Sequence, residues 1–188
     1  MHAGIFAEAY IKMRKEKSEK QSIKTKLLDL LSRREYSRAE LEQKIKTWLK
    51  RQQYLQSMEN DSEGGDFEFE QSIQNELQGE LDKFEAKGWL SDERYVESFI
   101  NQKASRLGGA RLRQELKTKG IHEDLVSVTL EQLENSEFER AHDVWERKFK
   151  VLPIDAKSYH KQMRFLIYRG FAVDIIKKIL NEANVQDK

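Results

Sequence analysis

Apolar residues recur along most of this chain at spacings of three and four, which is the period of an amphipathic α-helix. The pattern predicts a first helix over residues 22–34, a second that begins after Ser37, and a third that starts near Ile73 and stops at Gly88. Long alternating patterns typical of strands are absent, and the chain has one proline, Pro153. Because proline is the strongest helix breaker, helices can run through most of the sequence, and we expect an all-α fold.

One pattern occurs twice, fifty residues apart. Its first copy contains Leu116, Lys119, Gly120, Ile121, Asp124, Leu125, Val126 and Leu130. Its second copy contains Leu166, Arg169, Gly170, Phe171, Asp174, Ile175, Ile176 and Leu180. Internal repeats of this length are typical of a supersecondary unit stacked on copies of itself. We therefore expect tandem three-helix repeats, about three in number, in an elongated array whose long charged surface suits binding better than catalysis.

Turn and cap residues divide the chain into four parts. We expect an amino-terminal extension over 1–21, a first repeat over 22–90, a second over 91–135 and a third over 136–188. The first repeat contains a polar, glycine-containing stretch that predicts an acidic loop near 57–70. Ser37 and Glu40 have the spacing of a capping box. Gly88, Gly120 and Gly170 are predicted to end helices in the left-handed conformation.

The net charge of +1 hides an uneven distribution. Residues 94–120 have seven basic and two acidic side chains, residues 121–146 have one and eight, and residues 147–188 have ten and four. Such blocks can place a basic strip beside an acidic one on a folded surface. Charged residues are 36% of the chain and hydrophobic residues 38%, which favours small helical units over one large core.

Several classes of chemistry are disfavoured. The chain has no cysteine, no apolar run long enough to cross a membrane and no targeting segment, so we expect a cytoplasmic protein without thiolate chemistry. The histidines match no metal-ligand spacing: His2, His122, His142 and His160. Asp124 and Asp174 lie in first helical turns, where the helix dipole explains them. We expect neither enzymatic activity nor a metal, a cofactor or an ATP site.

An ordered set of short motifs identifies a family. In chain order these are Tyr36-Ser37 with Glu40-Leu41, Gly88-Trp89-Leu90-Ser91-Asp92 with Arg94-Tyr95, Gly108 with Arg111-Leu112-Arg113-Gln114-Glu115-Leu116, Lys119-Gly120-Ile121, Arg164-Phe165-Leu166 and Tyr168-Arg169-Gly170-Phe171. Over residues 22–182 the chain closely resembles the RecX regulatory proteins of bacteria. The resemblance implies a curved array of three-helix repeats that engages the filament of the recombinase RecA on single-stranded DNA. It also implies inhibition of filament growth, ATP hydrolysis and strand exchange.

Basic side chains around the second helix of the second and third repeats are the candidate contacts for RecA or for DNA phosphate. They are Arg106, Arg111, Arg113, Lys117, Lys119, Lys161, Arg164 and Arg169, with Tyr168 as an aromatic neighbour. The alternative interpretation is an ordinary solvated helix face, with Tyr168 in the core. Arg113 and Lys117 are predicted to project together, so reversing both to Glu should weaken inhibition.

Two other functions fit a helical array. A basic helix in a three-helix unit is also found in DNA-binding modules, which bind naked DNA with a steep dependence on salt. A structural scaffold is the third possibility. Aromatic residues at helix-stripe positions can stack on DNA bases, but we expect core packing for them: Trp48, Trp89, Tyr95, Phe99, Trp145 and Phe149. The high surface charge favours a monomer.

Overall fold

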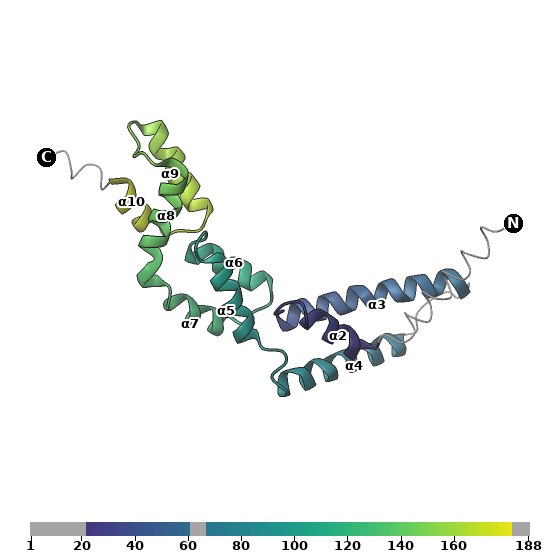
Figure 1. The fold of residues 1–188 in the computed structure, drawn as a ribbon. Coiled ribbons are helices and arrows are strands. Elements are labelled where there is room, and N and C mark those ends of the chain that lie inside the picture. Colours follow the sequence, from purple (N-terminus) through teal and green to yellow (C-terminus); the bar gives the residue numbers. More distant parts are fainter. Residues whose placement is uncertain (1–21, 61–66, 182–188) are drawn as a thin grey trace. The chain divides into compact units, whose positions relative to one another are not determined.

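The computed structural model describes residues 22–60 and 67–181, and every regular element in these ranges is a helix, which confirms the predicted all-α class (Figure 1). In chain order the helices are α2 (Ile23–Leu31), α3 (Arg38–Asn60), α4 (Phe67–Ala86), α5 (Asp92–Lys103), α6 (Gly109–Thr118), α7 (Glu123–Glu131), the 3-10 helix η1 (Glu134–Ser136), α8 (Glu137–Phe149), α9 (Ala156–Tyr168) and α10 (Val173–Asn181). The extension predicted at residues 1–21 lies outside the described residues. Internal contacts divide the chain into two compact units, residues 1–91 and 92–188.

The first unit has an apolar core between α2, α3 and α4. Its fully buried side chains are Leu27, Leu41, Ile45, Leu77, Leu81 and Phe84. Burial of a side chain of this size contributes roughly 1.5–3 kcal/mol relative to exposure. Hydroxyl caps begin two of these helices, since Ser22 Oγ accepts from Thr25 N at 3.2 Å and Ser37 Oγ accepts from Glu40 N at 3.1 Å. The half of the predicted capping box in which Ser37 accepts from the backbone of Glu40 is therefore confirmed.

The loop predicted near residues 57–70 is too long. Helix α3 continues to Asn60 and α4 begins at Phe67, so residues 57–60 and 67–70 are helical, and residues 61–66 lie outside the described residues. Polar composition does not by itself distinguish a loop from a helix, because Glu and Met are strong helix formers. At 23 residues α3 is long, yet none of the helices in the described ranges has an apolar stretch of the kind that crosses a membrane.

The second unit consists of two three-helix repeats in tandem. Around the first core, formed by α5, α6 and α7, the buried residues are Tyr95, Val96, Phe99, Ile100, Ala104, Leu112, Leu116, Ile121, Val126 and Leu130. Around the second core, formed by α8, α9 and α10, they are Ala141, Val144, Trp145, Leu166, Phe171, Ile176, Ile179 and Leu180. In each repeat every helix contacts the other two. The fifty-residue sequence repeat thus corresponds to a structural repeat.

The turn between the second and third helices is the same in both repeats. Gly120 has a φ of 73°, its N–H donates to Lys117 O at 3.0 Å, and Ile121 N donates to Leu116 O at 3.3 Å. Around Gly170, where φ is 85°, the equivalent bonds measure 2.8 and 3.3 Å. These are left-handed glycine caps of the kind predicted from the sequence.

Backbone hydrogen bonds join the start of α6 to the turn after α9. Gly108 N donates to Arg169 O at 2.9 Å, and Ala110 N donates to Gly170 O at 3.2 Å. A Cβ atom on Gly108 would lie 2.3 Å from Gly170 O, so a side chain at this position would force the backbones apart. The neighbouring repeat thereby satisfies amides at the start of α6 that have no partner within their own helix.

Two arginines of α8 reinforce this junction. Arg140 Nη1 donates to the carbonyl oxygens of Ala104 and Leu107, both at 2.9 Å, and Arg147 Nη2 donates to Ser105 O at 3.0 Å. Burial lowers the pKa of Arg140, a shift that the nearby carboxylate of Glu137 partly offsets. Guanidinium groups are suited to this role because their rigid fork can reach several carbonyls at once.

The aromatic positions predicted to be buried are buried or partly buried, with one exception. Those packed in the cores are Trp48, Tyr95, Phe99, Trp145 and Phe149. Trp89 is 46% exposed, its ring lies edge-on to Phe84 at 5.3 Å, and the Lys87 ammonium lies 4.8 Å from its centroid. The prediction for Trp89 was wrong because the residue follows the left-handed Gly88, where the helical register on which it relied has already ended.

Candidate partner-binding surface

An exposed tyrosine lies at the end of α9, close to the start of α6. Tyr168 is 78% exposed, and the guanidinium carbon of Arg111 lies 5.9 Å from the centre of its ring. The sequence left open whether this tyrosine belongs to the core or to the surface, and the structure places it on the surface. An exposed tyrosine beside an arginine combines the two residue types most enriched at the energetic centres of protein interfaces.

Three exposed cations continue from Tyr168 along one face of α9. They are Lys157, Lys161 and Arg164, and together with Tyr168 they are spaced by four, three and four residues. This spacing aligns them on one side of the helix, while Gln162 is buried. Lys157 is not among the residues predicted from the sequence, although its spacing of four from Lys161 places it on the same helix face. We call Lys157, Lys161, Arg164 and Tyr168 the α9 face.

Arg169 and Arg106 meet beside this face. Arg169 Nη1 donates to Arg106 O at 3.1 Å, and its guanidinium carbon lies 4.6 Å from the centroid of Phe165. Arg169 is therefore partly buried and holds the junction between the repeats, whereas the side chain of Arg106 is exposed. Of these two predicted contact residues, Arg106 is the one whose charge faces solvent.

The cations of α6 differ in how they are held. Arg111 Nε donates to Glu115 Oε1 of the same helix at 3.3 Å, and the same guanidinium group lies beside the ring of Tyr168. Arg113 forms an ion pair with Glu123 and donates to Ser127 Oγ at 3.0 Å, which holds it against α7. The sequence predicts that Arg113 and Lys117 project together. In the structure Arg113 is held against α7, whereas Lys117 is exposed.

Lys117 is exposed, and among the described residues it has no ion-pair partner. Lys119 is the C-cap residue of α6 and is partly buried. Because reversal of Arg113 would bring a second carboxylate beside Glu123, that substitution would disturb the repeat as well as any contact with a partner. Lys117 is the better position at which to probe this side of α6.

The carboxylate of Glu115 partly neutralises the positive charge of Lys103 and Arg111. Glu115 accepts hydrogen bonds from Lys103 and from Arg111. Hydrogen bonding to Lys103 makes the largest contribution to the lowered pKa of Glu115, and burial opposes it. Since this carboxyl stays ionised, it fixes Lys103 and Arg111 in place while the cations of the α9 face remain exposed. Exposed guanidinium and ammonium groups beside one aromatic ring suit carboxylates of a protein or phosphates of a nucleic acid.

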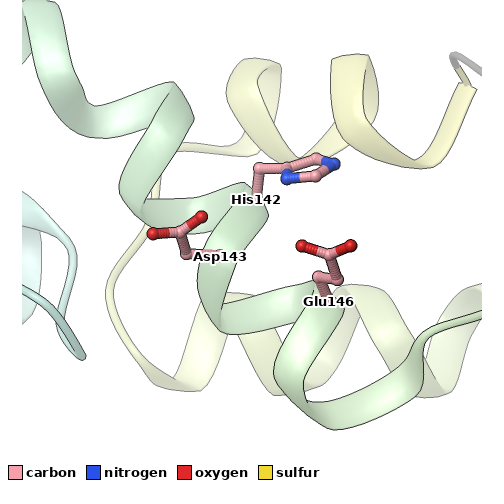
Figure 2. Close-up of side chains that lie close together, drawn as sticks. All are labelled: His142, Asp143 and Glu146. Atoms are coloured by element: carbon pink, nitrogen blue, oxygen red, sulfur yellow. The ribbon is translucent and has the colours of Figure 1, made fainter.

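A separate cluster on α8 has donors of the metal-ligand type. One ligand atom from each of His142, Asp143 and Glu146 lies within 4.8 Å of the others. Figure 2 shows that all three side chains come from the same stretch of one helix. The His142 ring packs 5.6 Å from Trp145 and stacks on Phe138 at 6.4 Å. The sequence predicted no metal site, and three donors from a single helix leave a tetrahedral site incomplete.

Comparisons with known proteins point to one family. The model of the second three-helix domain of RecX matches residues 91–130, and that of the third matches residues 135–180. The chain is 36% identical over 163 residues to the regulatory protein RecX of Leptothrix cholodnii, covering 87% of this chain and 90% of that protein. It is 37% identical over 163 residues to the regulatory protein RecX of Ralstonia nicotianae, covering 87% of this chain and 89% of that protein.

A solved structure supports the fold. The crystal structure of a regulatory protein RecX matches with a TM-score of 0.61 and 19% sequence identity, over 85% of this chain and 70% of that chain. At this level of identity the match bears on the arrangement of helices and on nothing finer. Both kinds of comparison agree with the tandem three-helix repeats seen in the second unit.

Proposed function

The chain belongs to the RecX family of regulatory proteins, and from this premise we propose that it binds the filament formed by RecA on single-stranded DNA and inhibits it. In this proposal the protein is a cytoplasmic, monomeric regulator without catalytic activity or cofactor of its own. Binding would limit filament growth, ATP hydrolysis and strand exchange. The observation that carries the proposal is the exposed basic α9 face beside Arg111, in a chain of this family.

The junction between the two repeats of the second unit supports a bridging mechanism. Backbone bonds at Gly108 and Ala110 join the start of α6 to the turn after α9, and the side chains of Arg140 and Arg147 join α8 to the segment before α6. A fixed pair of basic helices can contact two neighbouring RecA protomers at once, either blocking the addition of the next protomer or straining the filament towards disassembly. Fixing the two helices before binding lowers the entropy cost of the second contact.

Within this mechanism the nine predicted residues have different roles. Those proposed to contact the partner are Arg106, Arg111, Lys117, Lys161, Arg164 and Tyr168. Those proposed to support them are Arg113, Lys119 and Arg169, which are partly buried. Charge complementarity with acidic RecA side chains would speed encounter and weaken binding as salt rises.

Direct binding to DNA is the alternative, and the exposed Tyr168 ring beside Arg111 favours it, since aromatic rings and arginines hold single-stranded DNA in other proteins. The acidic block over residues 121–146 argues against it, because carboxylates repel phosphate. A weak DNA contact that assists filament binding is compatible with both observations.

The test is the rate of ATP hydrolysis by preformed RecA filaments on single-stranded DNA as the protein is added at substoichiometric amounts. We expect the rate to fall at low ratios of protein to RecA, with little binding to naked DNA. An unchanged rate together with tight, salt-sensitive binding to naked DNA would favour the DNA-binding alternative. An unchanged rate without DNA binding would leave only the scaffold interpretation.

A further inference from the structure

The loop between α8 and α9 exposes two aliphatic side chains. Ile154 is 91% exposed and Val151 is 66% exposed, whereas Leu152 between them packs against the core of the repeat. Single exposed apolar residues are common on protein surfaces and need no explanation. Two exposed β-branched residues on one six-residue loop are different when hydrogen bonds hold the backbone of that loop in place.

The left-handed residue Lys150 and the buried side-chain amide of Gln162 hold the first half of this loop. Lys150 has a φ of 60°, and Val151 N donates to Phe149 O at 2.7 Å across it. The carbonyl of Val151 accepts from Gln162 Nε2 at 3.1 Å, and Gln162 Oε1 accepts from Trp145 Nε1 at 2.7 Å. Left-handed backbone is uncommon outside glycine and persists where the surroundings enforce it. Gln162 is 6% exposed, so the loop is anchored in the core.

A capping box holds the second half. Asp155 Oδ1 accepts from Ser158 N at 2.7 Å, and Asp155 N donates to Ser158 Oγ at 3.1 Å. An apolar residue directly before such a cap often packs against the fourth helical residue, which here is Tyr159. Ile154 occupies that preceding position, yet its exposure of 91% leaves no surface for this contact. The apolar side chain of Ile154 therefore does not make the usual stabilising contact with the helix that follows it.

We propose that Val151 and Ile154 form an apolar tip that inserts into an apolar pocket with an acidic rim on the protein partner. This inference rests on the proposed function and takes a RecA protomer of the filament as that partner. Aliphatic side chains neither pair with phosphate nor stack as rings do, so the tip is directed at protein and not at DNA.

Charge around the tip supports an acidic rim. Lys148, Lys150 and Lys157 are exposed and lie within three residues of the tip in sequence, where they outnumber the one carboxylate, Asp155, which accepts the cap bond. The loop is also shaped before binding, which reduces the ordering cost that an interface must overcome. Lys157 belongs to the α9 face as well, so the tip extends that surface by an apolar contact at the start of the helix.

The experiment compares a double variant, Val151→Ser with Ile154→Ser, against a matched control, Val128→Ser with Val173→Ser. The control residues are valines that are 56% and 47% exposed on α7 and α10. Binding to preformed RecA filaments and to naked single-stranded DNA is measured by fluorescence anisotropy at two salt concentrations, and urea unfolding checks the fold. If the serine pair lowers stability, Val151→Thr with Ile154→Thr, which keeps the β-branched shape, replaces it.

We expect the tip variant to bind filaments about tenfold more weakly, by the same factor at both salt concentrations, because the contact is apolar. The control should stay within about twofold of the wild type, and binding to naked DNA should not change. Wild-type affinity in the tip variant would overturn the tip while leaving the proposed function standing. An equal loss for naked DNA would also overturn it. A wild-type protein that does not bind filaments would remove both proposals.

Discussion

Gly170 combines a left-handed backbone with a close contact at the position of a Cβ atom, and glycine is the residue type suited to both. Its φ is 85°, and a Cβ atom there would lie 2.3 Å from Arg111 N. Gly88 has only the first of these features, with a φ of 67° and open space around the Cβ position. We expect Gly88→Ala to cost about 1–2 kcal/mol of unfolding free energy, the cost of left-handed backbone. Gly170→Ala should cost more, because the junction between α6 and α9 must open as well.

Urea unfolding of the two alanine variants, followed by helical circular dichroism, separates these effects. A similar cost for both would mean that the approach of Gly170 to Arg111 relaxes without loss. The sequence repeat identified Gly170 as a helix-ending glycine, but it contained no information on Arg111, which lies 59 positions earlier. Contacts between repeats depend on how neighbouring units pack, and a pattern within one unit does not encode that.

Glu115 provides a prediction about pH. Its pKa is lowered in the folded protein, chiefly by hydrogen bonding to Lys103. The stability that it contributes is therefore fully present above its ordinary pKa and is lost as pH falls through the lowered pKa of the folded state. We expect Glu115→Gln to make the unfolding free energy less dependent on pH in that acidic range. The difference should be below about 1 kcal/mol, since the pair is partly solvated.

The measurement is a set of urea unfolding curves for wild type and Glu115→Gln between neutral and acidic pH. Glu97→Gln is a suitable control, because Glu97 is an exposed carboxyl on the neighbouring helix α5. Parallel pH profiles for wild type and Glu115→Gln would show that Lys103 and Arg111 do not stabilise the ionised carboxylate.

Among the helices, α9 depends on its N-cap residue, Asp155, more than its sequence pattern indicates. Asp155 accepts from Ser158 N at 2.7 Å, and this bond lowers the pKa of Asp155. We expect Asp155→Ala to lower the free energy of unfolding measurably, while Asp155→Asn, which can still accept the bond, should lower it much less. Chemical denaturation at neutral pH measures both. Equal losses would indicate that charge at the helix start matters more than the hydrogen bond.

Helix positions were predictable where an apolar stripe marked them, and α2 and the two turns at Gly120 and Gly170 are examples. The end of α3 and the start of α4 were not, because the polar composition of residues 57–66 predicts a loop as readily as a helix. The side of a helix on which a terminal aromatic lies was equally undetermined. Trp89 and Tyr168 both occur at helix ends, and their exposure of 46% and 78% depends on the turn that follows or precedes them.

In the second unit, Arg140 is one of the side chains that couple the two repeats. It donates from α8 to Ala104 and Leu107 of the preceding repeat. We expect Arg140→Met to cost about 2–3 kcal/mol of unfolding free energy, because these carbonyls lose charged donors. Hydrogen exchange at the amides of Gly108 and Ala110 should become faster. Unchanged exchange there would show that the backbone bonds hold the junction without Arg140.

The last prediction concerns charge on the surface of the molecule. Lys161 and Arg164 are exposed on the α9 face, and Lys177 and Lys178 are exposed on α10 of the same repeat. Reversal of each pair to Glu changes the net charge equally, so total charge alone predicts equal effects on filament binding. If the α9 face is the contact, its reversal should weaken binding about tenfold at low salt, and less as salt screens the charges.

Measurement of filament affinity for both reversal variants across a salt series distinguishes these possibilities. The α10 variant should remain within about twofold of the wild type at every salt concentration, because a charge outside the contact acts only through a screened field. Equal weakening of both variants would mean that the net charge of the repeat causes the effect, and it would rule out the α9 face as a specific contact. A loss that does not shrink with salt would point to damaged packing, since charge attraction is the one contribution here that salt screens.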